Sequence, residues 1–198
     1  MESLVYNRIM FEPLVKGWIG ELKTKATQKL LLDSKQYHSF NNVLLQGEKG
    51  TTQIDHIIVS KYGVFVVETK ERSGWIFGSE TDREWTQVFP TKKKVRFQNP
   101  LRQNYLHTET LKDCLGIERN KIHSLIVFWG DCELKTQLPP NVVKGIVEEI
   151  TYIKNKKQIL LTDDHVDRLC TQIQTIKNNT PILQGIRHAY SLHKKYQK

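Results

Sequence analysis

Two β-rich runs joined by a short turn occupy residues 54–70, and charged side chains interrupt both runs. The turn at residues 60–63 is too short for a crossover connection, so it predicts an antiparallel hairpin. Asp55, Glu68 and Lys70 lie within apolar, β-branched sequence of the kind that is buried in a sheet. Burying a charge costs several kcal/mol unless it is paired or binds a metal, so these residues require compensating partners.

Two loop placements fit this turn, and both bring the three charges onto one face of the hairpin. A loop at residues 61–62 sets Asp55 opposite Glu68, whereas a loop shifted by one position sets Asp55 opposite Lys70. Directly opposed residues lie roughly 4.5–5.5 Å apart. Two carboxylates at that separation raise each other's pKa, and a divalent cation between them removes the conflict.

Carboxylate oxygens in this arrangement suit a hard cation such as Mg²⁺ or Mn²⁺, which also accepts phosphate oxygens from a substrate. Such an ion supplies hydroxide near neutral pH, and Lys70 would orient the water or stabilise charge on phosphorus. The chemistry predicted is metal-assisted phosphodiester hydrolysis. The alternative is a salt-bridge cluster at the solvated end of an edge strand.

An ordered series of short motifs around the hairpin resembles the nuclease-related domain (NERD) family, a branch of the PD-(D/E)xK nuclease superfamily. The resemblance covers about residues 14–130. The motifs are Lys16-Gly17, Gly20-Glu21, residues 54–59, residues 63–70, Gly74-Trp75-Ile76, Gly78, Trp85-Thr86-Gln87, residues 97–100, Gln103 and His107. Ile54 stands where the proline that names the superfamily is expected, but proline is not a ligand.

The resemblance implies an α/β fold with a restriction-endonuclease-like core, in which helices flank a central mixed β-sheet. It implies that Asp55 and Glu68 hold Mg²⁺ or Mn²⁺, that Glu21 approaches the same ion, and that Lys70 is the catalytic lysine. The Thr69 backbone carbonyl is a further candidate ligand. The implied activity is that of a metal-dependent deoxyribonuclease, with RNA not excluded as substrate.

A first helix is expected from Leu14 to about Leu32, where apolar residues recur at helical spacing. Gly17 and Glu21 are four residues apart and share a face of it. Gly17 would let a nucleic-acid strand approach closely while Glu21 reaches the metal. The alternative is that Glu21 is solvated and that Gly17 only allows another element to pack closely against the helix.

A second helix is expected to begin at Asn99-Pro100 and to end at Gly116. Gln103 and His107 are expected on one exposed face, where they would contact the scissile phosphate or the metal-bound water. Gln103 starts a Gln-x-x-x-Tyr pattern, but His107 stands in the tyrosine position. The expected inner stripe consists of Leu101, Tyr105, Thr108, Leu111, Cys114 and Leu115.

A basic run follows the short β-like segments 75–77 and 84–89, which are expected to extend the sheet or form a flanking ribbon. The run would contact a phosphate backbone, or it is a solvated hairpin tip. Its cationic residues are Lys92, Lys93, Lys94 and Arg96. Trp75 and Trp85 either stack bases or pack in the core.

Charge and composition are compatible with a nucleic-acid partner. The 198 residues carry a formal net charge of +9, which suits a polyanion. The chain lacks an apolar run of about 18 residues, so we expect no membrane contact and a cytoplasmic location. Three widely spaced cysteines indicate reduced thiols without a catalytic role. Oligomer formation is left undetermined.

The domain organisation expected is a nuclease core at residues 1–135 and a C-terminal extension at residues 136–198 that packs on it. Residues 122–129 read as a strand that follows a helix, which predicts a crossover and a mixed sheet. A last helix is expected from about Thr162. Two other functions remain open: a catalytically weak nucleic-acid-binding module of the same fold, and a scaffolding protein with a basic surface.

Overall fold

The structure is a computed structural model that describes residues 32–48 and 50–179. The predicted first helix lies outside this part of the chain apart from its last residue, and Gly17 and Glu21 lie outside it too. The elements in chain order are β1 (His38–Gly47), β2 (Gly50–Ser60), β3 (Gly63–Glu71), β4 (Gly74–Phe77), β5 (Glu84–Val88), β6 (Lys94–Gln98), α2 (Pro100–Leu115), the 3-10 helix η1 (Arg119–Lys121), β7 (Ile122–Trp129), β8 (Cys132–Leu134), β9 (Val142–Lys144), α3 (Gly145–Lys154) and α4 (Asp163–Asn179).

The larger sheet has five strands in the order β1-β2-β3-β7-β9. The first three strands are antiparallel, whereas β7 runs parallel to both β3 and β9. The connection from β3 to β7 passes through α2, as expected for a parallel pair. The predicted fold class, a mixed sheet flanked by helices, is therefore confirmed. β9 also joins this sheet, while the domain boundary after residue 135 stays a prediction.

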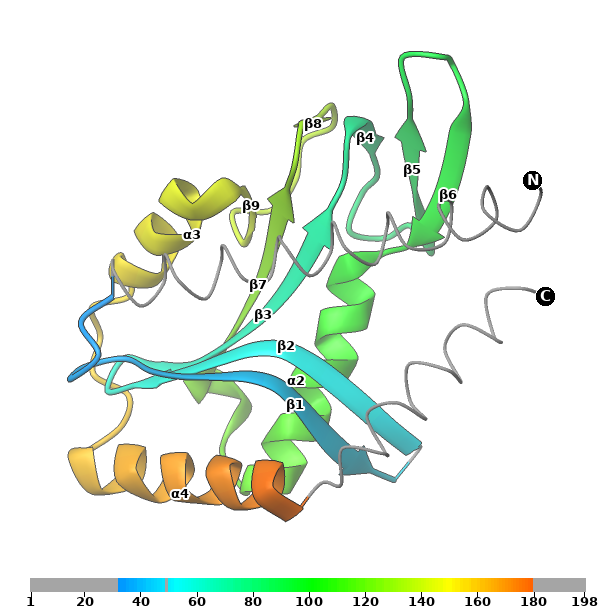
Figure 1. Ribbon diagram of the computed structural model, residues 1–198. Helices are drawn as coiled ribbons and strands as arrows, with labels where there is room; N and C mark the ends of the chain where they lie inside the picture. Colours follow the sequence, from blue (N-terminus) through cyan, green and yellow to red (C-terminus); the bar gives the residue numbers. More distant parts are fainter. Residues whose placement is uncertain (1–31, 49, 180–198) are drawn as a thin grey trace, which may run out of the picture.

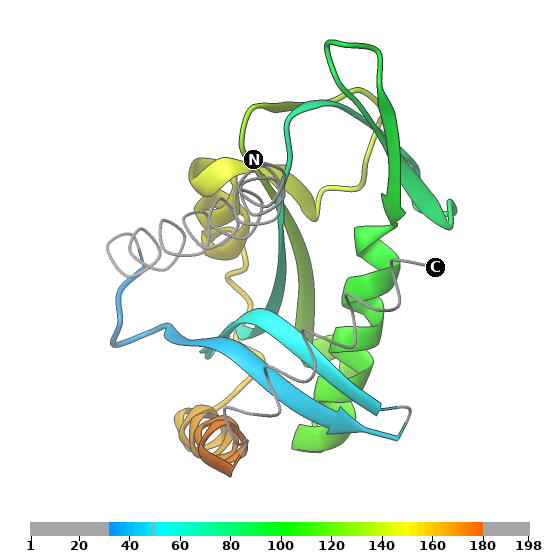
Figure 2. The ribbon, with the colours of Figure 1, turned by 45° about the vertical axis from the view of Figure 1, so that its right-hand side comes forward.

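Helices cover both faces of the larger sheet. Apolar side chains of α2 and α4 pack with β1, β2 and β3 in one core cluster, and those of α3 pack with β3, β7 and β9 in a second. Figures 1 and 2 show α2 and α3 on opposite sides of the sheet, with α4 alongside β1. The alternation of β3 explains this, because Val64 and Val66 belong to the first cluster while Phe65 and Val67 belong to the second.

The smaller sheet has four strands in the order β6-β5-β4-β8, and it continues the larger one. β4 pairs in parallel with β8 just as β3 pairs with β7. Two hydrogen bonds bridge the junction, from Arg72 N to Trp129 O at 2.9 Å and from Gly74 N to Asp131 O at 2.8 Å. Backbone pairing therefore continues from one sheet to the other, and the β-like segments after residue 74 form a second sheet beside the larger one.

The helix α2 begins and ends as predicted. The Asn99 side chain accepts a hydrogen bond from Leu101 N at 2.9 Å, and Gly116 ends the helix with φ 63°. The predicted inner stripe is wrong in two places, because Tyr105 is 55% exposed and Cys114 is also exposed. The buried face consists of Pro100, Asn104, His107, Thr108, Leu111 and Leu115.

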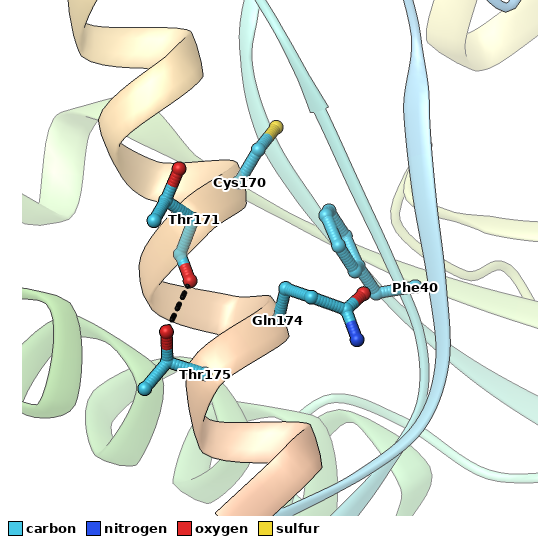
Figure 3. A pocket seen from close by; sticks show the side chains of 5 residues that line it. All are labelled: Phe40, Cys170, Thr171, Gln174 and Thr175. Atoms are coloured by element: carbon cyan, nitrogen blue, oxygen red, sulfur yellow. Dashed lines mark hydrogen bonds between the residues drawn. The ribbon is translucent and has the colours of Figure 1, made fainter.

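The shallow groove between α4 and β1 lies away from the charged residues of the hairpin. Phe40, Cys170, Thr171, Gln174 and Thr175 line it (Figure 3). Burial raises the pKa of Cys170 to about 11, and it raises the pKa of Cys114 and Cys132 as well. A thiol with a raised pKa is a poor nucleophile near neutral pH, in agreement with the predicted bystander role of the cysteines.

Candidate active site

The β2–β3 hairpin has the first of the two registers considered. Ser60 pairs with Gly63, so the loop consists of Lys61 and Tyr62. The ladder ends at the pair of His56 with Val67, and Asp55 and Glu68 are the next residues on their strands. His56 itself is fully buried and lies 2.5 Å from Asn41 Oδ1 through Nδ1.

The two strands separate at this position, and the side chain of Asp55 replaces the missing backbone pairing. If the antiparallel hydrogen-bond pattern continued, the backbone N–H of Thr69 would donate to a backbone carbonyl of β2. It donates instead to Asp55 Oδ2 at 2.9 Å. The Thr69 hydroxyl donates to the same oxygen at 2.8 Å. Ile54 and Ile57 lie in the same core cluster although they are three residues apart, which marks a break in the alternation of β2.

Three hydrogen bonds join Glu68, Lys70 and Gln103 in a closed triangle. Lys70 Nζ donates to Glu68 Oε1 at 2.5 Å, and Gln103 Nε2 donates to the same oxygen at 2.8 Å. Lys70 Nζ also donates to Gln103 Oε1 at 2.9 Å. Glu68 is only 3% exposed, so the lysine and the amide compensate a carboxylate that burial would otherwise disfavour.

His107 completes the surroundings of Glu68 from the buried side of α2. Its Nε2 lies 3.2 Å from Glu68 Oε2, and its Nδ1 lies 2.7 Å from Thr52 Oγ1. The distance from Nε2 to Glu68 Oε2 is at the long end of the hydrogen-bond range, so His107 restrains this oxygen loosely. The predicted exposed position of His107 is wrong: the residue is 5% exposed, so it faces Glu68 rather than solvent.

The two carboxylates have pKa values shifted in opposite directions. Burial, followed by the charge of Glu68, raises the pKa of Asp55 to about 6 despite its bonds from Thr69. Burial also raises the pKa of Glu68, but Lys70 and His107 outweigh it and hold that pKa below the ordinary value. Lys70 therefore stabilises the charge of Glu68 more than that of Asp55, for which burial and the neighbouring carboxylate prevail.

The carboxylate oxygens of Asp55 and Glu68 are suitable ligands for a divalent cation. Both hydrogen bonds to Asp55 fall on Oδ2, which leaves Oδ1, and the nearest group to Glu68 Oε2 is His107 Nε2 at 3.2 Å. Carboxylate oxygens are the hard ligands that Mg²⁺ and Mn²⁺ prefer. No cluster of three or more Asp, Glu, His and Cys side chains suited to a metal occurs within residues 32–48 and 50–179. A third acidic ligand would have to come from elsewhere, and Glu21 lies outside these ranges.

The predicted basic residues lie apart from this cluster, at the far end of the smaller sheet. Lys92 and Lys93 lie in the turn between β5 and β6, and Lys94 and Arg96 lie on the edge strand β6. All four are exposed. The hairpin is therefore solvated, and its cations are available to a polyanion.

Known proteins resemble the chain at the level of family and of sequence. The nuclease-related domain family matches the chain over residues 16–129. The chain belongs to this family. This NERD protein is also 34% identical to an uncharacterized protein of Bacillus anthracis over the full length of both chains. No solved structure matches it. Among the described residues of the NERD protein, no helix has the length and apolar character needed to cross a membrane.

Two residues that support the site of this NERD protein were not predicted from the sequence. Thr52 contacts His107 at 2.7 Å, and Asn104 Nδ2 donates to Val66 O at 2.9 Å, which ties α2 to β3. The helical spacing of Asn104, His107 and Leu111 is the sequence pattern that would have identified the inner face of α2.

Proposed function

We propose that this NERD protein is a nuclease that hydrolyses DNA phosphodiester bonds with Mg²⁺ or Mn²⁺. The observation that carries the proposal is the hydrogen-bonded triangle of Glu68, Lys70 and Gln103, with Asp55 on the neighbouring strand of the hairpin. A buried charged cluster is costly to maintain, and membership of a nuclease-related family supports a catalytic explanation for it.

Asp55 and Glu68 would hold the ion, with the Thr69 carbonyl and Glu21 as further proposed ligands. When bound, such an ion polarises the phosphoryl group and lowers the pKa of water. In the reaction the water oxygen forms a bond to phosphorus and one bridging P–O bond breaks. One proton of the water is released, and the leaving oxygen takes up a proton from solvent.

The side chains around Glu68 have separate roles in this proposal. Lys70 Nζ would orient the attacking water or stabilise the charge that develops on the phosphoryl oxygens. Gln103 holds Lys70 and Glu68 at once, so it sets the position of the ammonium group relative to the carboxylate. His107 cannot contact a polynucleotide directly from its buried position, and it acts by holding Glu68.

The experiment compares wild type with Asp55→Asn, Glu68→Gln and Lys70→Ala on labelled single-stranded and duplex DNA in Mg²⁺ or Mn²⁺. Each change should reduce turnover at least about 100-fold, as loss of a transition-state contact does in other enzymes. Asp167→Asn, an exposed carboxylate on α4, is the matched control and should cleave normally.

Calorimetric titration of Mn²⁺ separates the roles of these residues. Asp55→Asn and Glu68→Gln should weaken metal binding, whereas Lys70→Ala should lower turnover far more than metal affinity. Equal loss of both in Lys70→Ala would contradict its role. DNA binding without cleavage in every metal and substrate would reject the nuclease and favour the non-catalytic binding module.

A further inference from the structure

The outer face of the smaller sheet carries two cross-strand rows with the same order of side chains. Trp75 on β4 pairs with Val88 on β5, which pairs with Lys94 on β6. In the next outward row Phe77 pairs with Thr86, which pairs with Arg96. Each row therefore has an aromatic ring at one end, a small side chain in the middle and a cation at the other end.

The two aromatic rings contribute little to the core of the described fold. Trp75 is 46% exposed and Phe77 is 38% exposed, whereas Trp85 on the opposite face is fully buried and stacks on Phe128 at 6.0 Å. Of the two tryptophans considered for base stacking, Trp85 thus belongs to the core and Trp75 does not. The two exposed rings lie on the same face of β4, and neighbouring exposed apolar side chains are a common feature of binding surfaces.

The charges on and beside this face favour a polyanion. Lys94 and Arg96 lie on it, Lys92 and Lys93 lie in the adjoining turn, and Lys135 Nζ lies 5.4 Å from the centre of the Trp75 ring. Two acids share the face, Glu84 on β5 and Glu133 on β8. Glu133 is already paired with Lys135, so cations prevail over the rest of the surface.

We propose that these two rows bind a single-stranded segment of polynucleotide, with bases stacked on Trp75 and Phe77 and phosphates over Lys94 and Arg96. The proposal rests on the proposed function only for the class of ligand. Rings and cations are two strand spacings apart, roughly 9.5 Å, so one nucleotide can span each row from base to phosphate. Base stacking on aromatic side chains with cations along the backbone is the usual mode of single-strand binding.

The spacing between the rows explains why the segment must be single-stranded. Residues two apart on a strand are roughly 6.6 Å apart, about twice the 3.4 Å rise per base in one strand of a duplex. Neighbouring bases that stack on Trp75 and Phe77 must therefore be pulled away from each other. A duplex keeps its bases stacked and paired, so it can engage only the cations.

The rows lie on the opposite face of the sheet from the carboxylate cluster. Ile76 packs with Ile126 and Phe128, and these two residues pair with Glu68 and Lys70 across the β3–β7 ladder. Trp75 and Phe77 alternate with Ile76 and therefore face the other way. Contacts there should change substrate affinity and leave the chemical step unaltered.

The test measures binding of a fluorescent 20-nucleotide oligo(dT), oligo(U) and a 20-base-pair duplex by anisotropy in EDTA, where no cleavage occurs. Trp75→Ala should weaken oligo(dT) binding roughly tenfold or more, since a stacked base contributes about 1–3 kcal/mol. Trp75→Phe should restore binding to within about threefold, and duplex binding should change less than twofold. Ile159→Ala, an exposed apolar residue outside the sheets, is the control.

Equal effects of Trp75→Ala on oligo(dT) and duplex, or no effect on either, would overturn the proposal. If oligo(U) binds like oligo(dT), the rows accept RNA as well. Cleavage is a separate readout: Trp75→Ala should raise KM for single-stranded DNA without changing kcat, and a fall in kcat alone would contradict the assignment. Trp75-dependent binding in a protein that cleaves nothing would support the rows while rejecting the nuclease.

Discussion

The carboxylate of Asp55 lies beside the charge of Glu68, and burial together with that charge raises its pKa to about 6. In the unfolded chain an aspartate titrates near 3.9, so between these values the folded protein binds more protons than the unfolded one. The contribution of Asp55 to the free energy of unfolding is therefore fully present below the unfolded-state pKa of about 3.9, and it is lost as the pH rises through the folded-state pKa of about 6. The loss at neutral pH amounts to at most about 3 kcal/mol.

Asp55→Asn should remove this pH dependence, because the amide oxygen can still accept both bonds from Thr69 without a charge. We expect the metal-free variant to be about 1–3 kcal/mol more stable than wild type at pH 7 and similar to it at pH 4. Urea unfolding in EDTA at several pH values measures the difference. A difference that stays constant with pH would show that Asp55 is not the titrating group.

Lys70 stabilises Glu68, so its loss should leave a buried carboxylate without its nearest cation. We expect Lys70→Ala to lower the free energy of unfolding by about 2–4 kcal/mol, less than for a fully isolated pair because Gln103 remains. Adding Glu68→Gln should recover part of that loss. A double-mutant cycle by urea unfolding measures the coupling, and additive effects would contradict a direct pairing.

The sequence was informative about residues whose position depends on local geometry. A period of two and a short turn are enough to bring Asp55, Glu68 and Lys70 onto one face, although two registers stayed open until the structure showed the loop at residues 61–62. Gln103 and His107 reach Glu68 only because α2 packs on the sheet, and tertiary packing is not encoded in local spacing. The sequence therefore placed both residues near the proposed site but gave no indication that they contact Glu68 itself.

At the scale of elements, polar residues on a buried face explain the errors. The inner face of α2 contains Asn104 and His107, which are buried with polar partners: Asn104 Nδ2 donates to Val66 O, and His107 Nδ1 lies 2.7 Å from Thr52 Oγ1. The prediction from apolar spacing therefore assigned Tyr105 to the inner face of the helix, whereas Tyr105 is exposed.

The junction between the two sheets depends on a glycine. Gly130 has φ 84°, and a Cβ there would lie 2.4 Å from Arg72 O, the backbone of the neighbouring strand. Gly130→Ala must break the ladder between the sheets, so we expect a loss of stability of more than about 2 kcal/mol. Gly116→Ala is the matched control, since its φ is also positive but nothing lies within 4 Å.

Thermal unfolding followed by circular dichroism compares the two glycine variants. Gly116→Ala should lose only about 1 kcal/mol, the ordinary cost of a left-handed residue with a side chain. Similar losses in both variants would mean that close approach of the strands at Gly130 has no energetic importance.

At the scale of the whole molecule, the formal net charge of +9 predicts DNA binding that weakens steeply with salt. Replacing Lys92, Lys93 and Lys94 by alanine should reduce the slope of log affinity against log salt by roughly two to three, since each phosphate contact on a duplex contributes about 0.9. Alanine at Lys35, Lys154 and Lys157, which are exposed elsewhere, is the control with equal charge loss. Equal slopes for the two triple variants would show that overall charge alone governs binding.

The backbone pairing that continues from β3–β7 into β4–β8 has a mechanical consequence. Backbone hydrogen bonds that continue across the junction restrain the carboxylate end and the aromatic end against the independent movement that a flexible linker would allow. A nucleic acid held at both ends would therefore meet two groups of side chains at a nearly fixed separation.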